Sequence, residues 1–235
     1  MKDAKFNKNL DLMDREVSVA IESFYTYVGI HNYLYSNRAI YKILNQNPSF
    51  WNVTLHALHN NIFITLGRIF DNDRRDHSIH KLVNICLQNP QLFSIESLAR
   101  RKIGNGERPK WLDGYLSSAF EPSVNDLRIL EEEVSKLRSI YKSAYSDIRN
   151  KVIAHTEEFK DPLQISKLYS RTQIGDIEKL LYGLYDLLYV LRELFHNGRK
   201  PQFGVQTYYY ENKERISQTI QNVLNFFQPK GLERG

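Results

Sequence analysis

One short segment of the sequence carries residue types that could cleave a phosphodiester bond. Arg149 and Asn150 are followed by His155, with five residues between the arginine and the histidine. Histidine acts as a base or an acid near neutral pH, because its ordinary pKa is about 6.5. Arginine stays charged and donates two parallel hydrogen bonds to a phosphate. These residues could cleave RNA through its own 2′-hydroxyl group: His155 would act as general base or acid, Arg149 would hold the phosphate, and Asn150 would position it.

The segment follows a long predicted helix that Pro122 and Ser123 open. The apolar residues of this helix alternate three- and four-residue steps, which is typical of close helix–helix packing. They are Leu127, Leu130, Val134, Leu137, Tyr141, Ala144 and Ile148. A further step of seven reaches His155, so the pattern predicts that the histidine continues this packing seam. The structural alternative is a buried, hydrogen-bonded His155 beside an exposed Arg149.

The spacing of Arg149 and His155 bears on the number of subunits. Six residues of an α-helix turn through about 240° and rise about 9 Å, so the two side chains would not share a face. A two-fold axis beside the segment would bring both residues of two subunits around one cleft and supply two histidines, one as base and one as acid. We therefore expect a homodimer.

The rest of the chain must position this segment, and its apolar pattern is helical almost throughout. Its 235 residues include only 11 Gly and 7 Pro, a composition that favours helices over a β-sandwich or barrel. The other predicted helices span residues 10–35, 39–44, 50–70 after a Ser49 cap, short stretches after Ser78 and Ser94, 177–195 up to Asn197-Gly198, and 216–227. The sequence predicts an all-α bundle of long antiparallel helices with shorter helices on the connections.

With these elements, the sequence resembles the HEPN superfamily of helical domains. Nuclease members of that superfamily carry an arginine, a polar residue and, after four to six intervening residues, a histidine. The sequence is similar to the abortive-infection, AbiU-type branch over residues 10–195. The similarity rests on a long N-terminal helix, a helix with Trp51 that ends in Gly67-Arg68-Ile69-Phe70-Asp71, a charged loop, Ser78 and the Arg-Asn-Lys-Val-Ile-Ala-His segment.

The resemblance implies an obligate dimer with its cleft at the subunit interface. It implies a metal-independent endoribonuclease that acts in phage defence or as the toxin of a pair with a separate antitoxin chain. We expect residues 1–198 to form the HEPN-like domain and residues 199–235 to form a C-terminal helical extension, which could also belong to the same domain. The alternative function is a non-catalytic HEPN-like domain that binds a nucleotide, RNA or a partner protein.

A cluster of basic residues surrounds the loop at residues 104–109 and could follow an RNA backbone. The cluster comprises Arg100, Arg101, Lys102, Arg108 and Lys110. Trp111 and Tyr115 could add stacking on bases. The alternative is a solvated loop, since the net charge of +5 and the pI near 9.1 are mild.

Two pairs of histidines have a spacing that could chelate a metal from one helix face: His56 with His59, and His77 with His80. No acidic or thiol ligand completes either pair, and the single cysteine, Cys86, excludes a cysteine cluster. We therefore expect no metal and no cofactor, and a metal-dependent phosphohydrolase is the third candidate function. The charged first twenty residues and the short apolar stretches predict a cytoplasmic protein without a membrane span.

Overall fold

The structure is a computed structural model that describes residues 2–71, 78–154, 161–204 and 208–227. Helices account for all regular structure within these ranges, and the all-α prediction is confirmed. The elements are α1 (Lys2–Ser36), α2 (Arg38–Leu44), α3 (Pro48–Ile69), α4 (Ile79–Gln88), a 3-10 turn (Pro90–Phe93), α5 (Ile95–Ile103), α6 (Leu112–Leu116), α7 (Val124–Ala144), a π-helix (Ile148–Ala154), α8 (Pro162–Tyr169), α9 (Ile174–Asn197) and α10 (Tyr208–Asn225).

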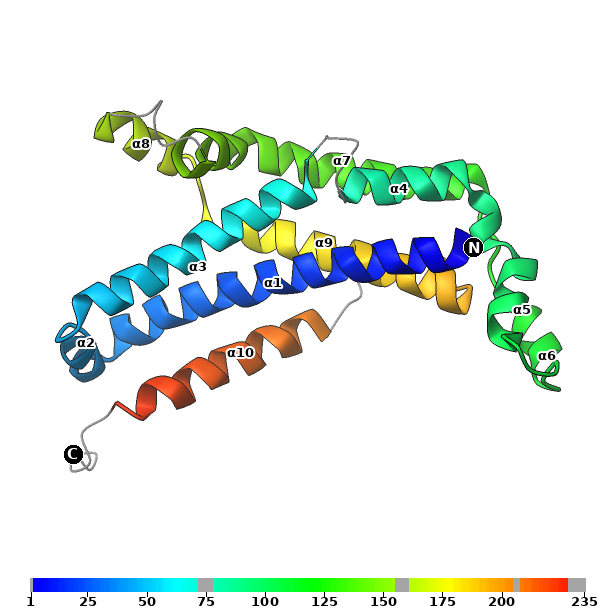
Figure 1. Cartoon of the computed structure of the whole chain (residues 1–235), viewed down its shortest axis with the longest axis horizontal. Helices are drawn as coiled ribbons and strands as arrows, with labels where there is room; N and C mark the ends of the chain where they lie inside the picture. The colour runs from blue at the N-terminus through cyan, green and yellow to red at the C-terminus, as the bar shows by residue number, and fades with distance from the viewer. Residues whose placement is uncertain (1, 72–77, 155–160, 205–207, 228–235) are drawn as a thin grey trace.

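Helix α1 lies at the centre of the bundle and packs against α3, α9 and α10 (Figure 1). The long helices α1, α3, α7 and α9 run antiparallel to their packing neighbours, as predicted, whereas α10 runs parallel to α1 (Figure 1). The short helices α5 and α6 lie at one end of the long axis, and α2 lies at the other (Figure 1). The bundle thus has two well-separated ends.

Three serines begin helices as the sequence predicts. The Ser78 hydroxyl accepts the amide N–H of Lys81 at 3.3 Å, and the Ser94 hydroxyl caps α5 in the same way. Ser123 and Asp126 form a reciprocal capping box at the start of α7. At the other end of a helix, Gly198 ends α9 in the left-handed conformation, with φ of 62°.

Helix α3 begins differently from the prediction. Its N-cap residue is Asn47 and Pro48 occupies the first turn, so Ser49 does not cap the helix. Proline suits this position, because its fixed φ is helical and its missing N–H group would have no partner there anyway. The sequence pattern also missed the short helices α6 and α8, which are only five and eight residues long.

The predicted seam of α7 is buried. Leu127, Leu130, Val134, Leu137, Tyr141 and Ile148 are all at most 7% exposed. Helix α9 approaches this seam closely: a Cβ atom at Gly183 would lie 2.5 Å from Cδ2 of Leu137. Contact between α7 and α9 therefore fixes the helix that leads to Arg149.

Helix α10 is tied to the rest of the bundle through tyrosines. Tyr209 is 1% exposed, and its hydroxyl group shares a 2.9 Å hydrogen bond with the hydroxyl group of Tyr25 on α1. Glu178 on α9 accepts hydrogen bonds from Tyr25 and from Lys213. Within the described ranges, no helix is long and apolar enough to span a bilayer.

Candidate functional site

The segment with Arg149 begins where α7 is anchored to α9. Tyr145 follows the last residue of α7 and is fully buried. Its hydroxyl group donates to the carbonyl oxygen of Gln173 at 2.8 Å and accepts the amide N–H of the same residue at 3.2 Å. Gln173 is the N-cap residue of α9. This contact fixes the point from which residues 146–172 depart.

Residues Ile148–Ala154 form a π-helix instead of continuing α7. A π-helix hydrogen-bonds to the fifth residue along the chain, and such turns occur often at functional sites. The prediction of an α-helical heptad from Ile148 onwards is therefore wrong for residues 148–154, whereas the described residues do not test the predicted rotation from Arg149 to His155. The amide N–H of Arg149 still donates to the carbonyl oxygen of Tyr145 at 3.1 Å, so the stretch remains linked to the end of α7. His155 itself lies outside the described residues.

Arg149 lies across the last turns of α3. A Cβ atom at Gly67 would lie 2.7 Å from Nε of Arg149 and 3.1 Å from its Cδ and Cγ atoms. Gly67 is buried, so the missing side chain leaves the space that the stem of the half-buried arginine fills. Only glycine allows the arginine to take this path. The Gly67-Arg68-Ile69-Phe70-Asp71 segment and the Arg149 segment, which are far apart in sequence, thus meet in the fold.

The guanidinium group of Arg149 has a fixed partner. Its Nη1 atom donates to the side-chain oxygen of Asn150 at 2.8 Å, and Asn150 is exposed. Asp147 and Lys151, on either side of this pair, form a surface ion pair of 3.3 Å. Asn150 therefore orients the arginine beside solvent, where a phosphate group can reach it.

Tyr141 forms the buried flank of this site. Its ring stacks on that of Phe70, with centroids 5.0 Å apart and an interplanar angle of 17°. Burial raises the pKa of Tyr141 to about 12, the nearby positive charge of Arg149 lowers it, and the carboxylate of Asp71 raises it. Both charges thus lie within electrostatic reach of one buried hydroxyl group. Sequence reasoning did not select Gly67, Phe70 or Tyr141 as site residues, although the first two belong to the segment that carries the family resemblance.

Arg100 and Arg101 of the basic cluster contact other parts of the bundle. The Arg101 side chain is 13% exposed and donates to the carbonyl oxygens of Leu92 and Phe195 at 2.8 and 2.7 Å. Its guanidinium group also lies 4.0 Å from the centre of the Phe195 ring. Arg100 and Arg101 both pair with Asp3. Arg101 is therefore a packing residue of the bundle, whereas Arg100 remains 62% exposed.

The other members of the cluster lie on the same end of the molecule. Arg108 pairs with Asp113, and Lys110 is exposed. Lys102 donates to the side-chain oxygen of Asn197 at 3.1 Å. Helices α5 and α6 place this end opposite to α8 and the end of α7 along the long axis (Figure 1). The structure therefore does not bring the basic cluster beside Arg149 of the same chain.

The histidine pairs lie in different surroundings. The ring of His59 packs against those of Tyr27, Phe63 and Tyr169, and burial lowers the pKa of His59. His56 is exposed and bonds to the side chain of Asn60, four residues further along α3, while His77 lies outside the described residues. In the part of the chain that the structure describes, no three His, Cys, Asp or Glu side chains gather as metal ligands would.

His80 on α4 gives a pH-dependent prediction. Burial lowers its pKa, and the positive charges of Arg138 and Lys142 on α7 lower it further. The unfolded chain, with a histidine pKa near 6.5, therefore binds a proton more readily than the folded chain, and folding stability falls as the pH drops below about 6.5. We expect the melting temperature of the His80→Gln variant to fall less between pH 7.5 and 5.5 than that of the wild type. Differential scanning calorimetry checks this, with exposed His56→Gln as the control; equal slopes for all three proteins would contradict it.

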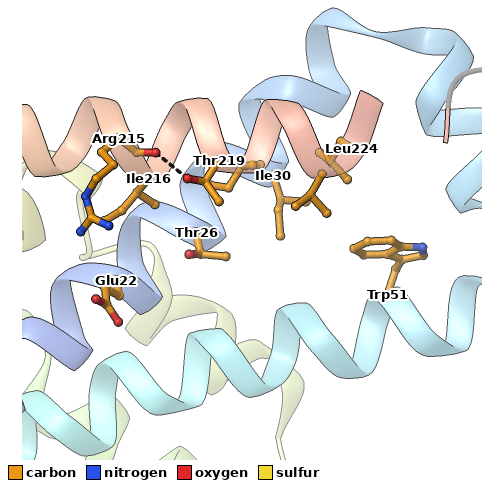
Figure 2. A pocket seen from close by; sticks show the side chains of 10 residues that line it. Glu22, Thr26, Ile30, Trp51, Arg215, Ile216, Thr219 and Leu224 are labelled. Atoms are coloured by element: carbon orange, nitrogen blue, oxygen red, sulfur yellow. Dashed lines mark hydrogen bonds between the residues drawn. The ribbon is translucent and has the colours of Figure 1, made fainter. Parts of the chain in front are cut away.

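Two pockets escaped the sequence analysis because their residues come from distant segments. One, of about 340 Å³, lies between α1, α3 and α10, with Trp51 projecting into it from α3 (Figure 2). Glu22 and Arg215 lie at the opposite end of this largely apolar pocket (Figure 2). Trp51 lies in the first turn of α3, whereas Arg149 contacts Gly67 in the last turns, so Trp51 and Arg149 lie at opposite ends of this helix. The second pocket, of about 800 Å³, lies beside the end of α9 and is lined by Lys102 and Lys200 among others.

The all-α bundle brings together the Arg149 segment and the Gly67 segment, the two segments on which the resemblance to the HEPN class of helical domains rests. The family model for the AbiU2 type of HEPN domain matches residues 3–214. This match covers most of the chain, which therefore belongs to the AbiU2 family of HEPN domains. No curated protein and no solved structure matches the chain significantly.

Proposed function

We propose that this protein is a metal-independent HEPN-type endoribonuclease that acts in phage defence or as a toxin. Membership of the AbiU2 family supports a function related to abortive infection. The observation that carries the nuclease proposal is the placement of Arg149, whose stem fills the space at Gly67 and whose guanidinium group is held by Asn150 beside solvent. A charged donor that is oriented in advance stabilises a transition state without further reorganisation.

Three side chains have separate roles in the proposed RNA cleavage. Arg149 donates hydrogen bonds to the phosphate oxygens as negative charge grows on the pentavalent phosphorus. Asn150 keeps the guanidinium group in place through the 2.8 Å hydrogen bond. His155 removes the proton of the 2′-hydroxyl group or protonates the leaving 5′-oxygen. The nucleophile belongs to the RNA, so the reaction needs no activated water.

The reaction needs one group to accept the proton of the 2′-hydroxyl group and another to protonate the leaving 5′-oxygen. One chain supplies a single histidine in this segment. We therefore propose that two copies of the chain meet at the Arg149 segment, so that two His155 residues serve one cleft. RNA is the proposed substrate, and a separate antitoxin chain is a proposed partner.

Cleavage of RNA in excess EDTA tests the proposal. We expect the wild-type protein to cut single-stranded RNA and to leave 2′,3′-cyclic phosphate ends, because the 2′-oxygen attacks the adjacent phosphorus. Mass spectrometry of the products identifies these ends. An Arg149→Ala protein, purified in the same way, reveals any contaminating nuclease. No cleavage of several RNAs by excess wild-type protein would contradict the nuclease proposal and favour the non-catalytic HEPN-like domain.

A further inference from the structure

The pocket beside the end of α9 combines positive charge with aromatic rings. It has a volume of about 800 Å³, and none of its ten lining residues is acidic. Three of them are cationic: Lys102 at the end of α5, and Arg199 and Lys200 just after α9. Two others are aromatic, Tyr115 and Phe120. The end of α5, the segment from Tyr115 to Phe120 and the segment after α9 thus build one basic pocket.

The cations of the pocket lie close to its rings. The Nζ atom of Lys102 lies 5.0 Å from the centre of the Tyr115 ring, and that of Lys200 lies 5.7 Å from the centre of the Phe120 ring. Arg199 pairs with Glu193 at 3.1 Å, and its side chain remains 69% exposed. Charged donors and aromatic faces therefore stand side by side, as the phosphates and bases of a nucleic acid require.

Hydrogen bonds between the segments fix the shape of the pocket. The Tyr115 hydroxyl group donates to the carbonyl oxygen of Asn197 at 2.9 Å. The amide N–H of Phe120 donates to the carbonyl oxygen of Gly198 at 2.7 Å. A Cβ atom at Gly198 would lie 2.7 Å from Cδ2 of Leu98, so the chain turns tightly against α5 here. The pocket is thus formed before any ligand arrives.

Several cations lie around His196 at this end of the molecule. His196, next to the pocket residue Asn197, has a lowered pKa. Burial is the largest cause, and the positive charges of Arg192, Arg101 and Lys102 contribute further, against a smaller opposite effect of Asp11. Of these three cations only Lys102 lines the pocket, and its effect on His196 is the smallest of the three.

We propose that this pocket binds nucleotides of a single-stranded RNA, with Lys102, Arg199 and Lys200 contacting phosphates. The rings of Tyr115 and Phe120 then contact the bases. This inference rests on the proposed function, in which RNA is the substrate, but it concerns a second contact outside the cleavage segment. The pocket holds the RNA and takes no part in the chemistry.

The position of the pocket sets a length of RNA. Phe120 lies four residues before the start of α7, and Arg149 lies five residues after its end. The 21 residues of α7 span about 30 Å, which corresponds to about nine stacked nucleotides at about 3.4 Å each. A stacked strand therefore needs about nine nucleotides to reach from Arg149 to the pocket, and an extended strand needs fewer.

Binding of a fluorescently labelled 20-nucleotide RNA tests the proposal, with the His155→Ala variant as the common background to prevent cleavage. We expect the double substitution Lys102→Gln and Lys200→Gln in this background to weaken RNA binding about tenfold. The slope of log K against log salt concentration should become shallower by about 1.4, because two phosphate contacts are lost. The control pair is Lys136→Gln and Lys179→Gln, which removes the same charge from surface ion pairs on α7 and α9. Equal loss of affinity in both pairs, or no loss in the first, would overturn the proposal.

Cleavage kinetics separate this inference from the proposed function. With His155 present, the pair Lys102→Gln and Lys200→Gln should raise KM for the 20-nucleotide RNA and leave kcat unchanged, while KM for a three-nucleotide RNA, which is too short to reach the pocket, stays as in the wild type. Cleavage with an unaltered KM for the long RNA would refute RNA binding by the pocket and leave the nuclease proposal intact. RNA binding that depends on Lys102 and Lys200, without any cleavage, would refute the nuclease proposal and support RNA binding by the pocket. Binding of AMP that requires Lys102 and Lys200, with RNA affinity unchanged, would refute the RNA assignment in favour of a free nucleotide.

Discussion

Replacing His155 with alanine should slow RNA cleavage by about 100- to 10,000-fold, the range that general acid–base catalysis contributes. In the proposed dimer, the substitution removes both the base and the acid of each cleft, so we expect a loss near the upper end. Single-turnover cleavage of a labelled RNA in EDTA measures it. The comparison requires variant and wild type of equal helicity, by circular dichroism, and equal oligomeric state, by light scattering.

The matched control for this variant is His56→Ala, because His56 is an exposed histidine on α3. Cleavage by this control should equal that of the wild type. Undiminished cleavage by the His155→Ala protein would show that His155 is not the catalytic histidine. If the Arg149→Ala protein were equally active, the activity would belong to a contaminant.

The Arg149→Lys variant should lose about 100- to 1,000-fold in cleavage rate, as enzymes do when one donor to a developing negative charge is removed. Lysine keeps the positive charge but cannot form the planar, two-pronged contact with a phosphate. It is also shorter and lacks the Nη1 atom through which Arg149 bonds to Asn150 at 2.8 Å. The loss should appear in kcat, measured at saturating RNA. A rate within twofold of the wild type would mean that charge alone suffices.

A companion variant, Gly67→Ala, tests the position of Arg149 and leaves its charge intact. The added methyl group would lie 2.7 Å from Nε of Arg149 and must displace that side chain. A displacement of about 1 Å can cost up to about 100-fold in rate. Alanine inside a helix is otherwise about 1 kcal/mol more favourable than glycine, so the melting temperature should not fall steeply. Full activity of Gly67→Ala would show that the path of Arg149 over α3 is unimportant.

The sequence predicted the parts of this fold that local pattern controls. The heptads from Leu127 to Tyr141 are buried in α7, and Ser78, Ser94 and Ser123 cap the helices expected of them. Caps and seams depend on residues three or four positions apart, so they can be recognised within one segment. Family membership was predicted for the same reason, since its motifs are short and contiguous. The domain boundary at residue 198 remains a prediction.

Contacts between distant segments could not be predicted in this way. The π-helix at Ile148–Ala154 follows a tyrosine that is anchored to Gln173, and the path of Arg149 depends on Gly67, some eighty positions earlier. Arg101 was expected at an RNA surface with its neighbours, yet its donors reach the carbonyl oxygens of Leu92 and Phe195. The catalytic roles of Arg149, Asn150 and His155 remain predictions.

The double hydrogen bond between Tyr145 and Gln173 closes residues 146–172 into a loop at its base. Ile148 and Leu168, which lie within this stretch, are buried in the same core as α7 and α9, so the stretch is packed against the bundle as well as tied at its base. The chain around Arg149 is thus held from two sides, by the Tyr145–Gln173 hydrogen bonds and by the contact with Gly67 on α3.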